Sequence, residues 1–439
     1  MQLEGFGSLP ASNRIVVGVQ TMKAQRHLKF RSGLINKLLA SAIILLYSGW
    51  ISYVIWRDKC LDFYVYYLAA YGFAHKVDMY ATGSNAAVWA SLAQELGIRN
   101  YTMPYLYPPF TAMLVWPLTF FPPRWAAFIW LTTTAMTFIA SAWLLGNTFP
   151  RSFGTTLSLA LLLFFVPSLT TLHAGQVNGF LLLTLTFALY AFVRQRCLWT
   201  GIGIAIGAML KIVPLAHLIY LAWRRCWWAV LASVAAIFLL SLLAVPLVGV
   251  KGLISYVDNF FLLTGANQLV TSGASQSVFS FFARLLVAED GRWCLTHNPA
   301  VAWWLGWGIA LAIIGLTMVL CWPNGASERI LALEFALVTA AVNLVMHHTW
   351  YHQLVLLLIP FFVVTEHALA DPRRRWVLLP VAMGYLATNV HGLFWHHLEF
   401  NPLLVSMPFY TSVMLWGLLA WMIAREKKVK GYFVGVLLR

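Results

Sequence analysis

Long apolar runs, separated by short polar or basic segments, make up most of this 439-residue chain. Most of the runs approach the roughly 20 residues that an α-helix needs to cross the hydrocarbon core of a bilayer. The pattern predicts an all-α polytopic membrane protein, a bundle of about ten to twelve transmembrane helices. The runs are 34–56, 104–121, 125–146, 153–172, 177–193, 198–223, 226–248, 301–321, 328–346, 353–370, 376–391 and 404–424.

The run 198–223 does not fit a single crossing. Arginine pairs flank it on both sides, namely Arg194 and Arg196 before it and Arg224 and Arg225 after it. Short basic loops stay in the cytoplasm, so a single span would place one pair on the wrong side of the membrane. Lys211 and Pro214 near its middle would also cost several kcal/mol inside the bilayer. We therefore expect a hairpin of two short helices with Lys211 at its outer end.

The same rule assigns the remaining segments to the two sides of the membrane. It predicts a cytoplasmic N-terminal segment at 1–32, a transmembrane domain at 33–424 and a cytoplasmic tail at 425–439. Arg151 and the basic loop 371–375 fall on the cytoplasmic side as well. The N-terminal basic residues that lead into an uncleaved first span are Lys23, Arg26, Lys29, Arg31 and Lys37.

Two long loops are predicted on the outer face, at 57–124 and 249–300, where we expect short amphipathic helices. Residues 104–123 contain six prolines. The run 104–121 is therefore expected to be re-entrant or to lie on the surface rather than to cross the membrane. Most of the unusual polar residues fall in the outer loops, which indicates that the functional site is on that side.

Composition supports the membrane assignment and excludes other classes. Hydrophobic residues make up 61% of the chain and charged residues only 10%, against about 25% in an ordinary soluble domain. The formal charge of +15 lies in short clusters between apolar runs, so we expect membrane lipids as partners and no nucleic acid. The five cysteines show no metal-binding spacing and are expected to be free thiols, with a Cys60–Cys294 disulfide as the alternative.

Asp62 is the first candidate for chemistry. It opens the segment 62-DFYVYYLAA-70 directly after the first span, at the outer membrane interface. Partial desolvation there raises the pKa of a carboxyl and makes the carboxylate a stronger base. The alternative is a carboxylate that only ends a helix or pairs with Lys59.

Five further motifs follow along the chain: 105-YLYPPF-110, 175-GQVN-178, 207-GAMLKIVPL-215, 275-SQSVFSFFARL-285 and 347-HHTWYHQLVLLLIP-360. Together with the Asp62 segment, and in this order, they resemble glycosyltransferase family 87. The resemblance runs from about residue 57 to about residue 360. It implies a GT-C type fold and an enzyme that moves a sugar from a lipid phosphate donor to an acceptor hydroxyl outside the cytoplasm.

The resemblance implies that Asp62 is the catalytic base. Lys211, at the hairpin tip, offers a point charge to the donor phosphate, the alternative being a lysine that only snorkels to the interface. Arg284 is seven residues after Ser277, on the same face of a helix, and is a second candidate for the phosphate. Its alternative role is a salt bridge with Glu289 or Asp290.

His348 and His352 have the i, i+4 spacing that shares a helix face, and we expect them to contact the donor phosphate rather than a metal ion. Uncharged and aromatic side chains are the candidates for binding the sugar or the acceptor. Gln176 and Asn178 either hold sugar hydroxyls or cap helices. The expected substrate-binding residues are Tyr66, Gln176, Asn178, Gln276, Ser277 and His347.

The sequence thus predicts an inverting glycosyltransferase of the plasma membrane with an extracytoplasmic site. The resemblance favours mannose as the sugar, polyprenyl phosphate as its carrier, and a lipid or glycan as the acceptor. We expect no metal and no cofactor, since the Asp62 segment has no second carboxylate and the chain has no glycine-rich nucleotide loop. The alternatives are a GT-C enzyme for another sugar such as arabinofuranose, a glycan ligase, and a transporter or flippase. No role is predicted for His391, His396 and His397.

Overall fold

The fold was analysed in a computed structural model, which describes residues 41–42, 45–57, 59–82, 85–102, 104–149, 155–263, 269–287, 294–323 and 327–429. The basic N-terminal residues and Arg151 lie outside these ranges. The chain divides into two compact units, Met1–Trp50 and Ile51–Arg439, and the second contains all the candidate site residues.

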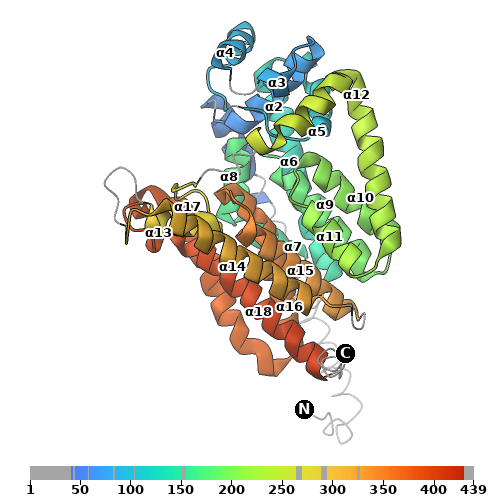
Figure 1. Cartoon of the computed structure of the whole chain (residues 1–439), viewed down its shortest axis with the longest axis vertical. Helices are drawn as coiled ribbons and strands as arrows, with labels where there is room; N and C mark the ends of the chain where they lie inside the picture. The colour runs from blue at the N-terminus through green and yellow to red at the C-terminus, as the bar shows by residue number, and fades with distance from the viewer. Residues whose placement is uncertain are drawn as a thin grey trace, which may run out of the picture. The chain divides into compact units, whose positions relative to one another are not determined.

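Helices account for nearly all the regular structure in the described ranges, where the one β-type pairing is an isolated antiparallel bridge between Ser275 and Trp350 (Figure 1). The helices are α2 (Leu61–Ala74), α3 (Met79–Thr82), α4 (Ala86–Glu95), α5 (Pro109–Val115), η2 (Trp116–Phe120), α6 (Pro123–Thr148), α7 (Thr155–Leu163), α8 (Val166–Ala174), α9 (Asn178–Val193), α10 (Cys197–Leu210), α11 (Leu215–Trp223), α12 (Trp227–Leu263), α13 (Val278–Leu286), α14 (Pro299–Leu320), α15 (Glu328–Val345), η3 (Tyr351–Leu357), α16 (Leu358–Ala370), η4 (Pro372–Val377), α17 (Leu378–Leu398), η5 (Leu404–Ser406) and α18 (Met407–Val429).

Within the described ranges, six helical stretches are long and apolar enough to cross a membrane, which confirms a multi-pass membrane protein. They are Pro123–Thr148, Trp227–Asp258, Pro299–Leu320, Tyr351–Ala370, Pro372–Leu398 and Leu404–Lys427. Shorter apolar helices occupy Leu45–Trp56, Pro109–Phe120, Asn178–Val193 and Cys197–Leu210. The predicted run 153–172 is not one helix: it divides into α7 and α8, because Pro167, in the first turn of α8, has no amide hydrogen with which to continue α7.

The expected hairpin at 198–223 is confirmed. Helix α10 ends at Leu210, and Lys211 follows in an extended conformation. Ser233 of α12 donates to the carbonyl of Gly201, and Ser241, further along α12, contacts Met209, further along α10. In both pairs the two residues are 32 positions apart in the sequence. Helices α10 and α12 therefore run parallel, so α11 between them must run back. Gly201 permits this close packing, because a Cβ there would strike the carbonyl of Ala229.

The basic segments meet at one end of the bundle. Helix α9 ends at Val193, and the guanidinium of the following residue, Arg194, donates to the carbonyl of Asn147 at the end of α6. Buried Glu334 forms ion pairs with Lys427 over 2.9 Å and with Arg224 over 3.4 Å. These contacts bring the ends of α11 and α18 to the start of α15. Because each cation there has a carboxylate or carbonyl partner, the desolvation of this cluster is offset by hydrogen bonding.

The opposite end carries the hairpin tip and the segment 104–121. Helices α5 and η2 cover only Pro109–Phe120, and twelve residues rise about 18 Å, less than the roughly 30 Å hydrocarbon core. Thr111 donates to the carbonyls of Met209 and Leu210 at the end of α10. The segment is therefore tied to the hairpin tip and makes no complete crossing.

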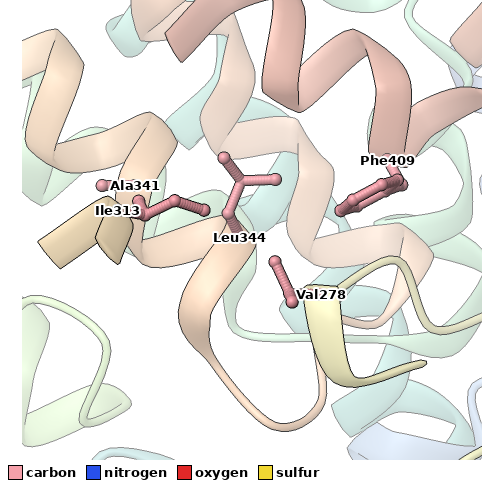
Figure 2. Close-up of a cluster of buried hydrophobic side chains, with 5 residues drawn as sticks. All are labelled: Val278, Ile313, Ala341, Leu344 and Phe409. Atoms are coloured by element: carbon pink, nitrogen blue, oxygen red, sulfur yellow. The ribbon is translucent and has the colours of Figure 1, made fainter. Parts of the chain in front are cut away.

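Short helices also lie in both predicted outer loops, α3 and α4 in the first and α13 in the second. Helix α12 bends at Gly249, where φ is +70°, so its apolar part ends at the limit expected from the sequence. Helix α13 packs on α14, α15 and α18 through a buried cluster (Figure 2) formed by Val278, Ile313, Ala341, Leu344 and Phe409. This packing fixes the end of the loop 269–277, which carries the serine-rich motif.

Candidate active site

Asp62 stands in the first turn of α2, where its carboxylate accepts two side-chain hydrogen bonds. Gln176 Nε2 donates to Oδ2 over 2.7 Å, and Thr102 Oγ1 donates to Oδ1 over 3.1 Å. Desolvation by burial raises the pKa of Asp62, while these two bonds and the charge of Lys211 oppose the rise. The result is a carboxylate that is held in one orientation and is more basic than an exposed aspartate.

Two tyrosines determine which way the Gln176 amide faces. Its Oε1 accepts hydrogen bonds from Tyr66 over 2.9 Å and from Tyr107 over 3.1 Å. With the oxygen engaged in this way, the NH₂ group is turned toward Asp62. The two tyrosine rings meet edge to face at 4.6 Å, so each ring also holds the other in place. Gln176 therefore acts on Asp62, and Tyr66 acts through Gln176.

The turn before Gln176 explains the glycine of the GQVN motif. Gly175 ends α8 with φ of +72°, and a Cβ there would lie 2.6 Å from the Cβ of Phe63. Its carbonyl accepts a hydrogen bond from the Trp130 indole over 2.8 Å. A left-handed turn pressed against α2 requires glycine, and this turn delivers Gln176 to Asp62.

Lys211 is brought to the same place from the hairpin tip. Its Nζ lies 3.5 Å from Oδ1 of Asn178, the first residue of α9. Burial lowers the pKa of Lys211 to about 8, and the negative charge of Asp62 opposes this shift. A carboxylate and an ammonium group thus share one site, each altering the proton affinity of the other.

His352 completes this cluster. The charge of Lys211 reaches it, and its backbone carbonyl is fixed by a 3.0 Å hydrogen bond from Thr171. Two buried nitrogens here, Nε2 of His352 and Nδ2 of Asn178, have no hydrogen-bond partner in the described part of the protein. Buried polar atoms are almost always paired, so such nitrogens beside a lysine are suited to a bound anion.

The predicted helix face shared by His348 and His352 is wrong. Helix α15 ends at Val345, the backbone of 346–350 is irregular, and His352 belongs to the 3₁₀-helix η3. The Ser275–Trp350 bridge holds this stretch in place of a helix. Among the described residues no three His, Cys, Asp or Glu side chains are grouped as metal ligands.

His347 lies in an aromatic environment formed by α13 and α14. Its ring stacks on Phe279 at 4.0 Å and on Trp303 at 5.2 Å, and its carbonyl accepts from Ser277 over 2.8 Å. Burial lowers the pKa of His347, and the neighbouring His348 lowers it further. These contacts make His347 part of the packing between α13 and the 346–350 segment.

The serine-rich motif is occupied by contacts within the protein. Ser277 caps α13 by accepting from the amide of Ser280. Gln276 Nε2 donates to the carbonyls of Gly273 and Val405, and its Oε1 accepts from the amide of Phe409. The backbone N–H of Gln276 also donates to the carbonyl of Thr349, and this bond joins the motif to the histidine-rich segment.

Arg284 holds the same loop. Its guanidinium donates to Oγ of Ser406 and to the carbonyls of Ser272 and Ser275. Burial lowers the pKa of Arg284 to about 9. The acidic residues expected as its alternative partners, Glu289 and Asp290, lie outside the described ranges.

The three remaining histidines do not form one site. His391 is buried beside Tyr351, with ring centroids 5.1 Å apart, whereas His396 and His397 are exposed. Sequence reasoning also missed two residues of the Asp62 cluster, Thr102 and Tyr107. The repeated tyrosines of YLYPPF were visible, but only the fold shows that the second one reaches Gln176.

The fold and this cluster therefore define a multi-pass helical membrane protein that holds a carboxylate and a lysine together at one end of its bundle. The chain belongs to glycosyltransferase family 87, whose model matches residues 105–348. This range covers Gln176, Asn178 and Lys211, starts after Asp62 and ends before His352. Membership of this family identifies the chain as a membrane glycosyltransferase and argues against the alternative of a transporter or flippase.

Two relatives carry the same name, polyprenol-phosphate-mannose-dependent alpha-(1-2)-phosphatidylinositol pentamannoside mannosyltransferase. The protein from Mycolicibacterium smegmatis is 27% identical over 347 residues, which cover 74% of this chain and 75% of the relative. The protein from Mycobacterium tuberculosis is 23% identical over 352 residues, covering 75% and 76% respectively. No solved structure matches the chain.

The tyrosine pair makes a testable contribution to the site. Replacing both Tyr66 and Tyr107 by Phe frees the Gln176 oxygen, so the amide is no longer oriented toward Asp62. We expect an approximately tenfold loss of transfer at neutral pH, with the acidic limb of the pH profile moved to higher pH. The matched control is Tyr71→Phe. It removes a tyrosine hydroxyl of the same helix, but this hydroxyl donates to Glu95 and not to Gln176. An unmoved acidic limb in the double variant would contradict this role.

Proposed function

We propose that this enzyme transfers mannose from a polyprenyl-phosphate donor to a hydroxyl group of a lipid or glycan acceptor. The observation that carries the proposal is the cluster of Asp62, Gln176 and Lys211, which pairs an oriented base with a cation suited to phosphate. The names of the two relatives support mannose and its polyprenol carrier.

In the proposed reaction Asp62 takes the proton of the acceptor hydroxyl as its oxygen attacks C1 of the sugar. The bond from C1 to the phosphate oxygen breaks, and its electron pair leaves with the polyprenyl phosphate. Attack from the face opposite the leaving group inverts the anomeric centre, so a β-linked donor gives an α-linked product. Proton removal by a positioned carboxylate contributes about 10²–10⁴-fold to such reactions.

Lys211 is proposed to hold the departing phosphate, on which negative charge grows during the reaction. The unpaired nitrogens of Asn178 and His352 complete a set of donors beside it. Donors already in place for a developing charge stabilise the transition state without reorganisation. We propose this role for Asn178 in place of a contact to the sugar, because its Oδ1 faces Lys211.

The other predicted residues are proposed to act at a greater distance from the reaction. The side chains of Arg284 and Gln276 make their described hydrogen bonds to the loop 272–275 and to Val405–Phe409, and that of Ser277 bonds Ser280 and the carbonyl of His347. We infer that they position the segment that leads to His352. His347 remains a candidate for binding the sugar or the acceptor and His348 for the donor phosphate, since both lie between that loop and η3.

The site is proposed to face the extracytoplasmic side of the plasma membrane. It lies at the end of the bundle opposite Arg194, Arg224 and Lys427, and basic ends of membrane proteins stay in the cytoplasm. An impermeant maleimide added to intact cells should label a cysteine introduced at Arg99 but not one at Arg373. The reverse pattern would place the site in the cytoplasm.

The function is tested with purified protein and a panel of donors. Polyprenyl-phosphate mannose should support transfer to glycolipid acceptors, whereas polyprenyl-phosphate arabinofuranose and a mannose nucleotide should not. Transfer should continue in a chelator, since Lys211 supplies the cation for the phosphate. Transfer from polyprenyl-phosphate arabinofuranose alone would show that the sugar is arabinofuranose and not mannose. Loss of transfer in the chelator would show that the reaction requires a metal ion.

A further inference from the structure

Tyr107, which turns the Gln176 amide toward Asp62, lies in a stretch without regular structure. Residues 104–108 belong to no helix, so no helical hydrogen bonds fix the backbone there. The carbonyl of Tyr107 instead accepts a hydrogen bond from the hydroxyl of Tyr80 over 2.7 Å. Tyr80 belongs to the short helix α3 and is only 1% exposed. Because buried polar groups are almost always paired, this bond is retained, and Tyr80 fixes the backbone from which the Tyr107 side chain projects.

The position of Tyr80 depends in turn on Asp78. Oδ1 of Asp78 accepts hydrogen bonds from the backbone amides of Tyr80 and Ala81, both over 3.1 Å, and so caps the first turn of α3. Oδ2 accepts from the hydroxyl of Ser255 over 2.7 Å. Ser255 belongs to the part of α12 that follows the bend at Gly249. One carboxylate therefore ties α3 to a helix that is 177 positions away in the sequence.

These hydrogen bonds form an unbroken path from α12 to the carboxylate of Asp62. Helix α3 holds the backbone of Tyr107, and the hydroxyl of Tyr107 donates to Gln176 over 3.1 Å. Gln176 then donates to Asp62 over 2.7 Å. Each bond fixes the group that makes the next one, because hydrogen bonds are directional.

We propose that Tyr80 is a positioning residue for the catalytic carboxylate, and that Asp78 holds it in place from α12. This role rests on the proposed function, in which Asp62 takes the proton of the acceptor hydroxyl. Without the Tyr80 bond the backbone of Tyr107 is free to move, and the amide of Gln176 is turned less firmly toward Asp62. Donation from Gln176 lowers the pKa of Asp62, so weaker donation raises that pKa.

The test reads the protonation of Asp62 without any sugar transfer. Dicyclohexylcarbodiimide reacts with buried carboxyl groups in their protonated form. Full-length protein in detergent is treated with it at a series of pH values, and mass spectrometry measures the labelled fraction of the peptide that contains Asp62. In Tyr80→Phe the pH of half-labelling should lie about half a pH unit above that of the wild type, which is an acid about threefold weaker. The acidic limb of kcat/KM should move by the same amount.

Three further variants separate this role from a general loosening of the fold. The Tyr256 ring packs on Tyr80 at 5.1 Å, but its hydroxyl makes no hydrogen bond within the described ranges. Tyr256→Phe should therefore label as the wild type does. Asp78→Ala should shift the labelling as Tyr80→Phe does, because α3 loses its cap. Asp78→Asn should restore the wild-type value, since asparagine caps a helix as well as aspartate does.

Half-labelling of Tyr80→Phe at the wild-type pH would overturn the proposal, and so would an equal shift in Tyr256→Phe. A downward shift in Asp78→Asn would also overturn it, because the charge of Asp78 and not its hydrogen bonds would then act on Asp62. Shifted labelling with an unmoved acidic limb of kcat/KM would confirm that Tyr80 positions Asp62 and show that Asp62 is not the base. The positioning role and the proposed function therefore fail separately.

Discussion

Asp62→Asn should reduce sugar transfer by about 10³-fold, within the range for loss of a general base. Asparagine has nearly the same shape and still accepts the hydrogen bond from Thr102, so the fold around α2 is kept. It cannot take a proton from the acceptor hydroxyl. The measurement is the turnover rate with saturating donor and acceptor, together with donor affinity, which should change little because the phosphate contacts are untouched.

Glu95→Gln is the control for this variant. Glu95 is an exposed acid of the same loop region and bonds Tyr71 rather than a residue of the Asp62 cluster. It should transfer sugar at a rate within about twofold of the wild type, as expected for an exposed substitution. A turnover rate for Asp62→Asn within tenfold of the wild type would falsify the assignment of Asp62 as the base.

Lys211→Met should lower turnover by about 10²–10³-fold, the usual effect of removing one preorganised donor from a developing oxyanion. Methionine fills a similar volume at the hairpin tip but carries no charge. Removal of the ammonium group also removes the interaction that lowers the pKa of Asp62, so the acidic limb should move to higher pH. Lys251→Met, an exposed change at the same end of the bundle, should have little effect. A variant at Lys211 that loses donor affinity but keeps its turnover would contradict transition-state stabilisation.

The two shifted pKa values predict a bell-shaped pH profile for kcat/KM. The pKa of Asp62 is raised, so activity rises with pH as that carboxyl loses its proton. The pKa of Lys211 is lowered to about 8, so activity falls as the pH passes that value and the ammonium group is lost. Bound phosphate favours the charged lysine, and the alkaline limb of kcat should therefore lie at higher pH than that of kcat/KM. Lys211→Arg should abolish the alkaline limb, because arginine stays protonated.

The pairing of Asp62 with Lys211 has a structural cost. Helix α10 stops short of a full crossing, and Gly207 leaves no room for a Cβ between Thr184 and Pro214. This tight, broken hairpin is what brings Lys211 to the depth proposed for the donor phosphate. The segment 104–121 is needed at the same place and therefore does not cross the membrane. It packs on the tip of the hairpin and contributes Tyr107 to the site.

Charge placement along the sequence was sufficient to predict the hairpin. The cost of a mid-membrane lysine and the preference of arginines for one side act through the solvent, independently of neighbouring helices. Run length was less informative: 153–172 divides just before Pro167, and α15 is apolar but carries three charged residues, Glu328, Arg329 and Glu334, so it does not count among the long apolar spans. Local proline chemistry and burial among other helices both override a simple hydropathy window.

Side-chain partners were beyond the reach of the sequence. The spacing of His348 and His352 indicated a shared helix face, yet helix α15 ends at Val345, before both histidines. The bridge between Ser275 and Trp350 holds the backbone there in a non-helical conformation. Arg284 reads as a free cation in the sequence, but its donors are taken by Ser406 and by carbonyls of its own loop. Both outcomes depend on residues more than 70 positions away or on loop geometry.

The sequence by itself determined the class of membrane protein and the broken hairpin at 198–223, and both follow from the transfer of apolar and charged groups between water and lipid, which each segment expresses on its own. It proposed Asp62 and Lys211 for the chemistry only together with the resemblance to a known family. Only the tertiary structure decided that Gln176 orients Asp62, that Tyr107 orients Gln176, and that His352 joins Lys211. Hydrogen bonds are short-ranged and directional, so their partners are defined only once the helices have packed.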